Sequence, residues 1–100
     1  MASSQAYHAL EQALAVSGRM LEAAEMGDWE QVTRLDLERR RWLAQGYPGD
    51  EQSSSFLAVM LEHNRRLLAM ARHAKDNVEQ AMTDQQKRHQ ALGAYMRVIR

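Results

Sequence analysis

Apolar residues recur at spacings of three and four along most of this chain, which is the pattern of amphipathic α-helices. One series runs through residues 4–26, and a second runs through residues 29–45. Between them Gly27 can end one helix and Asp28 can cap the next. The pattern therefore predicts two antiparallel helices joined by a very short turn. The first stripe consists of Leu10, Ala13, Leu14, Ser17, Leu21 and Ala24, and the second of Trp29, Val32, Leu35, Trp42 and Leu43.

A loop and a third helix are predicted after this hairpin. Residues 46–55 contain the only proline, two glycines and several cap-forming residues, so they predict a loop in which a serine caps the next helix. From Phe56 to Met82 the apolar residues cover close to half of the helix circumference. A stripe that wide predicts contact with two neighbouring helices at once. It consists of Phe56, Leu57, Met60, Leu61, Leu67, Leu68, Ala71, Ala74, Val78 and Met82.

The end of the chain allows two interpretations. Residues 83–90 are polar, and Thr83 and Gln86 have the spacing of a capping box, which would begin a fourth helix that folds back. Positions from residue 57 to residue 99 also alternate at spacings of four and three, as in a coiled coil, although Asn64, Lys75, Gln85 and His89 weaken this seam. This alternation favours one unbroken helix from Phe56 to Ile99, about 66 Å long, that pairs with another polypeptide. Either arrangement predicts a terminal surface that changes partners.

Composition agrees with this helical pattern. The chain has 100 residues, of which 45% are hydrophobic, enough for one core. Proline occurs once, and Val, Ile and Thr are too few to form a sheet. We therefore predict an all-α fold in one domain over residues 1–100: an antiparallel hairpin packed on a long third helix, with a separable C-terminal helical segment at residues 83–100. This is a three- to four-helix bundle.

Charge and residue usage argue against several classes of function. Thirteen basic residues balance thirteen acidic ones, so the net charge that favours direct nucleic-acid binding is missing. No apolar run approaches the roughly 20 residues that cross a bilayer, and the first 18 residues do not have the pattern of a signal peptide. The absence of cysteine suits a reducing cytoplasm.

No motif predicts catalysis or a bound cofactor. The four histidines include no pair at the i,i+4 spacing of a helical metal site, and no glycine-rich phosphate loop or serine elbow occurs. We therefore expect no catalytic, cofactor-binding or metal-binding residues. The basic run at residues 39–41 fans out around a helix, although Arg39 falls within the apolar stripe, where its stem could pack and its head reach water.

One short motif carries a family resemblance. The turn Gly27-Asp28-Trp29-Glu30 follows an apolar helix end, and a helix with leucine and arginine comes after it. This arrangement resembles the flagellar export chaperones of the FliT family. Residues 64–68 and the pair Ala94-Tyr95 are similar to the third and fourth helical segments of that family. The likeness thus covers most of the chain in the family's order.

The resemblance implies a small cytoplasmic protein that holds the flagellar filament-cap protein before type III secretion. It then hands this client to the export gate and the export ATPase complex. Some members also restrain the flagellar master transcription regulator, and the C-terminal helix serves as an autoinhibitory lid. In this chain the apolar residues of that segment are Leu92, Tyr95, Met96 and Ile99.

We expect the client to insert an amphipathic helix into a groove between the second and third helices. The expected contacts are Leu37, Trp42, Leu43, Phe56, Met60, Leu67 and Met70. The alternative is a structural coiled-coil or bundle protein whose third helix builds a homo-oligomer without any client. Light scattering separates the two hypotheses, because only a chaperone gains a defined complex with the cap protein.

Overall fold

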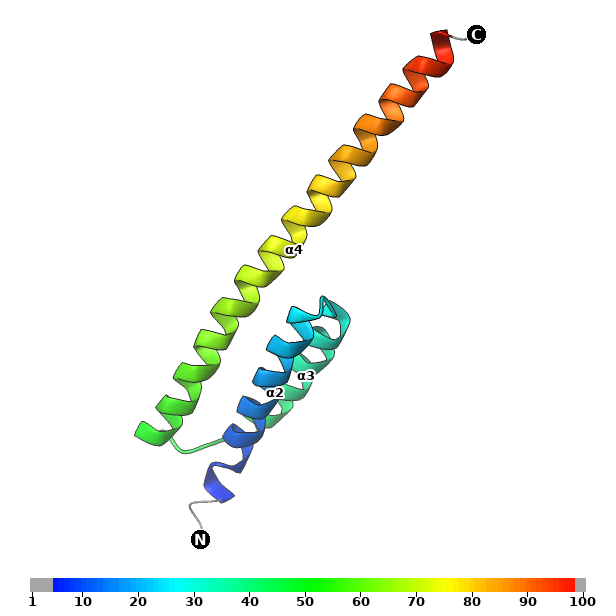
Figure 1. Cartoon of the computed structure of the whole chain (residues 1–100). Helices are drawn as coiled ribbons and strands as arrows, with labels where there is room; N and C mark the ends of the chain where they lie inside the picture. The colour runs from blue at the N-terminus through cyan, green and yellow to red at the C-terminus, as the bar shows by residue number, and fades with distance from the viewer. Residues whose placement is uncertain (1–4, 99–100) are drawn as a thin grey trace. The chain divides into compact units, whose positions relative to one another are not determined.

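Within residues 5–98 the fold consists of three α-helices, in the order predicted (Figure 1). A computed structural model of the chain describes residues 5–98, with side chains described for residues 5–87 and Gln90. The helices are α2 (His8–Glu25), α3 (Trp29–Ala44) and α4 (Glu51–Val98). Every regular element within residues 5–98 is a helix, so the all-α prediction is confirmed.

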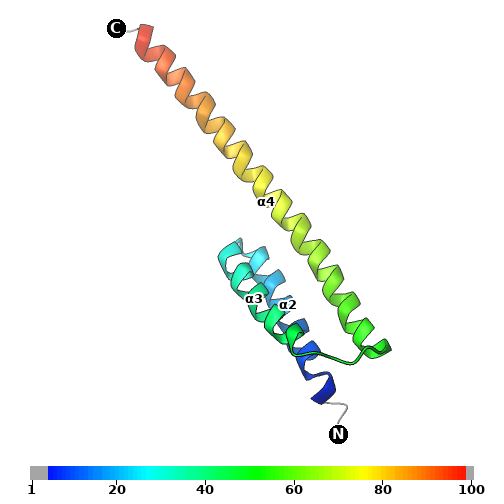
Figure 2. The ribbon, with the colours of Figure 1, turned by 180° about the vertical axis from the view of Figure 1, so that it is seen from behind.

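A tight turn joins α2 to α3, and the two helices lie side by side in opposite directions (Figures 1 and 2). Gly27 takes φ +74°, which a side chain would strain. The N–H groups of Gly27 and Asp28 then bond the carbonyls of Ala24 at 3.0 Å and Ala23 at 2.9 Å. This is a Schellman motif. Asp28 Oδ1 also accepts from the N–H of Gln31 at 3.2 Å, so the predicted cap of α3 is confirmed.

Helix α4 begins at Glu51, five residues before the predicted start at Phe56. The predicted serine cap is wrong. The carboxylate of Asp50 accepts from the N–H of Ser53 at 2.9 Å, and the Asp50 carbonyl accepts from the N–H of Ser54 at 3.0 Å. Aspartate caps as well as serine does, and Asp50 stands three residues before the amide that it satisfies.

Helix α4 continues without a break through Thr83. The Thr83 hydroxyl donates to the Glu79 carbonyl at 2.9 Å, the bond that a threonine makes in the middle of a helix. Thr83 therefore does not cap a new helix. Of the two interpretations of the C-terminal segment, the backbone shows the unbroken helix.

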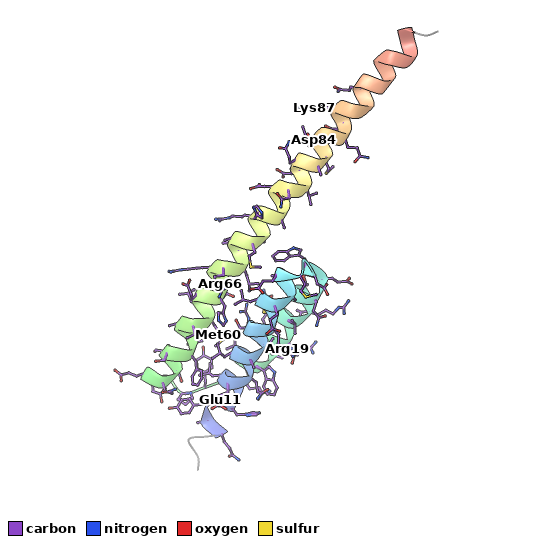
Figure 3. All side chains as sticks on the ribbon, viewed as in Figure 1. Glu11, Arg19, Met60, Arg66, Asp84 and Lys87 are labelled. Atoms are coloured by element: carbon purple, nitrogen blue, oxygen red, sulfur yellow. The ribbon has the colours of Figure 1, made fainter. Side chains whose placement is uncertain are left out.

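The hydrophobic core consists of two clusters. The turn cluster, near Gly27, consists of Val16, Met20, Leu21, Ala24, Leu35 and Leu67. The loop cluster, near the segment between α3 and α4, consists of Leu10, Ala13 and Met60. Met60 lies on the side of α4 that faces α2 (Figure 3). Both clusters combine α4 with the hairpin, so burial of apolar area, at about 25 cal/mol per Å², holds the three helices together.

The chain divides into two units, residues 1–70 and 71–100. All residues of both core clusters belong to the first unit. In the second unit, the described side chains from Lys75 to Lys87 are all exposed, including Val78 and Met82. Asp84 accepts a hydrogen bond from Gln80 there, at 3.3 Å.

Candidate functional site

The seven predicted partner-binding residues all lie in the first unit but differ in exposure. Leu37 has 51% of its surface exposed, as a residue on the outer side of the hairpin should. Met60 and Leu67 are buried in the loop and turn clusters, respectively. The remaining four are half-buried and pack against one or both clusters: Trp42, Leu43, Phe56 and Met70. Only some members of the predicted set are therefore accessible to a partner in this arrangement.

A groove between α3 and α4 is lined by two of the seven predicted partner-binding residues, Leu43 and Met60. Its volume is about 300 Å³. Its lining consists of Asp36, Arg39, Arg40, Leu43, Leu57, Met60, Leu61 and Asn64. Four of these residues are apolar, and Leu61 among them is 56% exposed. The groove thus combines an apolar part with a polar part.

Leu57 and Leu61 line this groove although the predicted contact set did not include them. Both lie in the predicted stripe on the third helix, and they are four residues apart. The apolar stripe covers two faces of α4, one toward the hairpin core and one toward the groove. Sequence periodicity alone does not show to which face a residue of the stripe belongs.

The polar part of the groove is the edge of a buried hydrogen-bond network centred on Arg39. The Arg39 residue is 9% exposed, and its Nη1 donates to Ser17 Oγ at 3.2 Å and to Asn64 Oδ1 at 2.8 Å. Its Nη2 pairs with Asp36 Oδ1 at 3.1 Å. A single guanidinium group therefore connects α2, α3 and α4. We call Ser17, Asp36, Arg39, His63 and Asn64 the polar layer.

His63 joins the polar layer through Ser17, which is fully buried. The Ser17 hydroxyl lies 2.9 Å from His63 Nδ1. Which of the two groups donates depends on the tautomer of the imidazole. Ser17 Oγ thus has two hydrogen-bond partners inside the protein, Arg39 and His63, which offsets the cost of burying a hydroxyl group.

The polar layer interrupts the apolar residues that pack between the helices. On α4, His63 and Asn64 stand between Met60 of the loop cluster and Leu67 of the turn cluster. On α2, Ser17 stands between Val16 and Met20 of the turn cluster. Any sliding of α4 along the hairpin would bring an apolar residue against the guanidinium group. The layer therefore specifies the register in which α4 packs, as buried polar residues do in coiled coils.

A second polar contact ties the start of α2 to the start of α4. The Tyr7 hydroxyl donates to Asp50 Oδ2, and the Tyr7 and Phe56 rings lie 6.2 Å apart. The hydrogen bond raises the pKa of Tyr7 above its ordinary value and, with the Ser53 amide, lowers the pKa of Asp50 below its ordinary value. Its contribution to stability is therefore complete between the ordinary pKa values of the two groups. It is lost as the pH falls through the lowered pKa of Asp50 or rises through the raised pKa of Tyr7.

The predicted regulatory segment lies outside the described side chains. Leu92, Tyr95 and Met96 fall within the backbone of α4, and Ile99 follows its last residue. Their contacts stay a prediction.

The described residues hold no group of three or more His, Asp or Glu side chains placed to bind a metal ion. Among the same residues, no helix has the length and apolar character needed to cross a membrane.

The comparison with protein families gives one result that covers nearly the whole chain. The family model described as flagellar protein FliT matches residues 7–97. The matched range includes α2, α3, all but the last residue of α4, the groove and the polar layer. The chain therefore belongs to the FliT family, and the resemblance carried by the Gly27-Asp28-Trp29-Glu30 turn is confirmed. Neither the curated proteins nor the solved structures give a significant match.

Family membership places the protein among the flagellar export chaperones. It also implies flagellar proteins as partners. The family is one of chaperones and is not known for enzymatic activity.

Proposed function

We propose that this protein binds an amphipathic helix of the flagellar filament-cap protein in the groove between α3 and α4. It then delivers that client in the cytoplasm to the export ATPase complex and the export gate. The observation that carries the proposal is the groove itself, which presents apolar side chains from two neighbouring helices beside a polar edge. A helix laid into such a groove buries its apolar face and leaves its polar face in water.

Leu61 is the residue on which the proposal is best tested. It lines the groove and is 56% exposed, so a client can reach it and a substitution there leaves the core clusters intact. Met60 and Leu67 are less useful, because a glutamate at either buried position would unfold the bundle before any loss of binding could be measured. Leu37 forms a separate candidate contact on the outer side of α3.

The test compares Leu61→Glu with Val59→Glu. Val59 is also an exposed apolar residue of α4, at 45%, but it does not line the groove. Titration calorimetry with the C-terminal segment of the cap protein should show at least about tenfold weaker binding for Leu61→Glu, a loss of about 1.4 kcal/mol. The affinity of Val59→Glu should stay within twofold of the unmodified protein.

Circular dichroism provides the control for folding in both variants. The proposal fails if the cap-protein segment does not bind the unmodified protein, or if both folded variants bind as well as it does.

A regulatory role is also proposed for Leu92, Tyr95, Met96 and Ile99, which would act as a lid over the groove in a second state in which α4, unbroken from Glu51 to Val98 in this structure, bends before this segment. A lid competes with the client, so the apparent affinity falls by the fraction of molecules that are open. Deleting residues 90–100 should then tighten client binding by about tenfold. Weaker binding after the deletion would assign the segment to the client interface instead. Restraint of the flagellar transcription regulator belongs to the same proposal, and co-purification of the two proteins tests it.

Self-assembly is the second candidate function. Leu61 and Leu68 are both more than half exposed and stand seven residues apart on α4, the spacing of a helix-pairing seam. A homo-oligomer without a client would show a multiple of the 11.5 kDa chain mass in light scattering, and Leu68→Glu would restore the monomer. A monomer that gains mass only with the cap-protein segment supports the chaperone.

A further inference from the structure

The polar end of the groove carries more positive than negative charge. Two arginines, Arg39 and Arg40, line it together with one carboxylate, that of Asp36. Both oxygens of this carboxylate are engaged, Oδ1 with Arg39 at 3.1 Å and Oδ2 with Arg40 at 3.0 Å. Because Asp36 is the only acidic residue in the groove lining, the formal charge of the lining is +1.

The two arginines that carry this charge differ in their access to water. The Arg39 side chain is 10% exposed, and its other two partners, Ser17 and Asn64, are neutral. The Arg40 side chain is 73% exposed, and an exposed ion pair contributes little to stability. Arg40 can therefore turn from Asp36 toward a second carboxylate at low cost, while Arg39 stays fixed and retains Asp36.

We infer that the client helix presents one acidic side chain to this end of the groove, where it pairs with Arg40 and accepts from the amide group of Asn64. Asn64 uses Oδ1 for Arg39, so its amide N–H groups are available as donors. This inference rests on the proposed function, because it describes the client of the same groove.

The lining also indicates where the acidic residue lies relative to the apolar residues of the client. From Leu57 to Asn64 the α4 wall of the groove rises by about 10 Å, which is two helical turns. A client helix therefore needs apolar residues at one end of this span and its carboxylate about one to two turns away. An amphipathic helix whose groove-facing side is entirely apolar fits less well, since it would leave the excess positive charge covered and unpaired.

The experiment measures binding of the C-terminal segment of the cap protein to Arg40→Gln and to the matched control Arg41→Gln. Arg41 is the next residue of α3, is exposed, and does not line the groove. We expect Arg40→Gln to weaken binding by about tenfold and to reduce its dependence on salt, whereas Arg41→Gln changes affinity by less than twofold.

Each Asp and Glu of the cap-protein segment is then changed singly to its amide. One of these changes should weaken binding to the unmodified protein by about tenfold but cause no further loss with Arg40→Gln, as expected for directly paired residues.

The outcomes separate this inference from the proposed function. The inference is overturned if Leu61→Glu weakens binding but neither Arg40→Gln nor any amide substitution does. It is also overturned if Arg41→Gln causes as large a loss as Arg40→Gln. If the cap-protein segment does not bind at all, the proposed function itself fails and the inference falls with it.

Discussion

Replacing Arg39 with alanine should destabilise the bundle more than a typical substitution does. The change removes the packed stem and leaves the fully buried Ser17 oxygen without its donor. An unsatisfied buried polar group costs about 1–3 kcal/mol, and truncating a large side chain in a core adds about 2–5 kcal/mol. Asp36 retains Arg40, and exposed Asn64 can bind water, so these two residues add little. We therefore expect a loss of at least about 3 kcal/mol, the lower end of the sum of these two contributions.

A second variant separates the polar chemistry of the layer from its packing. Replacing Ser17, Arg39 and Asn64 with Ala, Met and Leu together removes the buried guanidinium group and the two neutral groups that bind it. Such replacements are often neutral or stabilise a protein by about 1–4 kcal/mol. The triple variant should therefore be at least as stable as the unmodified protein, despite containing a change at the same arginine.

Urea unfolding followed by circular dichroism measures both variants. In thermal melts, a loss of 3 kcal/mol should lower the Tm by about 12–24 °C for a unit of this size. A loss within about 1 kcal/mol for Arg39→Ala, below the cost of the packing and polar losses together, would show that Arg39 does not hold the three helices together. A triple variant that unfolds as easily as Arg39→Ala would show the same for the polar chemistry of the layer.

Four further predictions concern the caps, the core and the terminal segment. Asp28→Ala should cost about 1 kcal/mol in urea unfolding, because it leaves one amide at the start of α3 unsatisfied. Trp42→Ala should cost about 3–5 kcal/mol in the same assay, because this indole packs against both core clusters. The Tm difference between the unmodified protein and Tyr7→Phe should be constant from pH 5 to pH 9 and should vanish in acid and in strong base, since the hydrogen bond needs a charged Asp50 and a protonated Tyr7. Deleting residues 90–100 should lower the free energy of unfolding by no more than the contribution of a closed lid, about 1.4 kcal/mol, because both clusters end before residue 71.

Sequence periodicity predicted the hairpin well because its signals are local. Gly27 and Asp28 are adjacent, and each acts on backbone groups within five residues, so their roles follow from the order of residue types alone. The exposure of Leu37 follows from the same helical geometry. The start of α4 was misplaced because Asp50 and three nearby serines are all good caps, and only the backbone geometry selects between them.

The polar layer was harder to predict because its members are far apart in sequence. Arg39 bonds Ser17 across 22 residues and Asn64 across 25. Each of the three, taken alone, is a polar interruption in an apolar stripe, and a long arginine side chain in that position can equally extend its head into water. The layer could have been predicted from the positions of Ser17, Arg39 and Asn64. These three polar residues come to the same height when the antiparallel hairpin packs beside the third helix.

Because α4 is synthesised last, the core that the three helices share is completed late in biosynthesis. The hairpin is complete at Ala44, yet both apolar clusters need residues of α4, the last of which is Leu67. At about 5–20 residues per second, the core-facing side of the hairpin stays uncovered for roughly 1–5 s after α3 has been made. During that interval the nascent chain exposes an apolar surface from Leu10, Val16 and Leu35, and its own next segment is the helix that covers it.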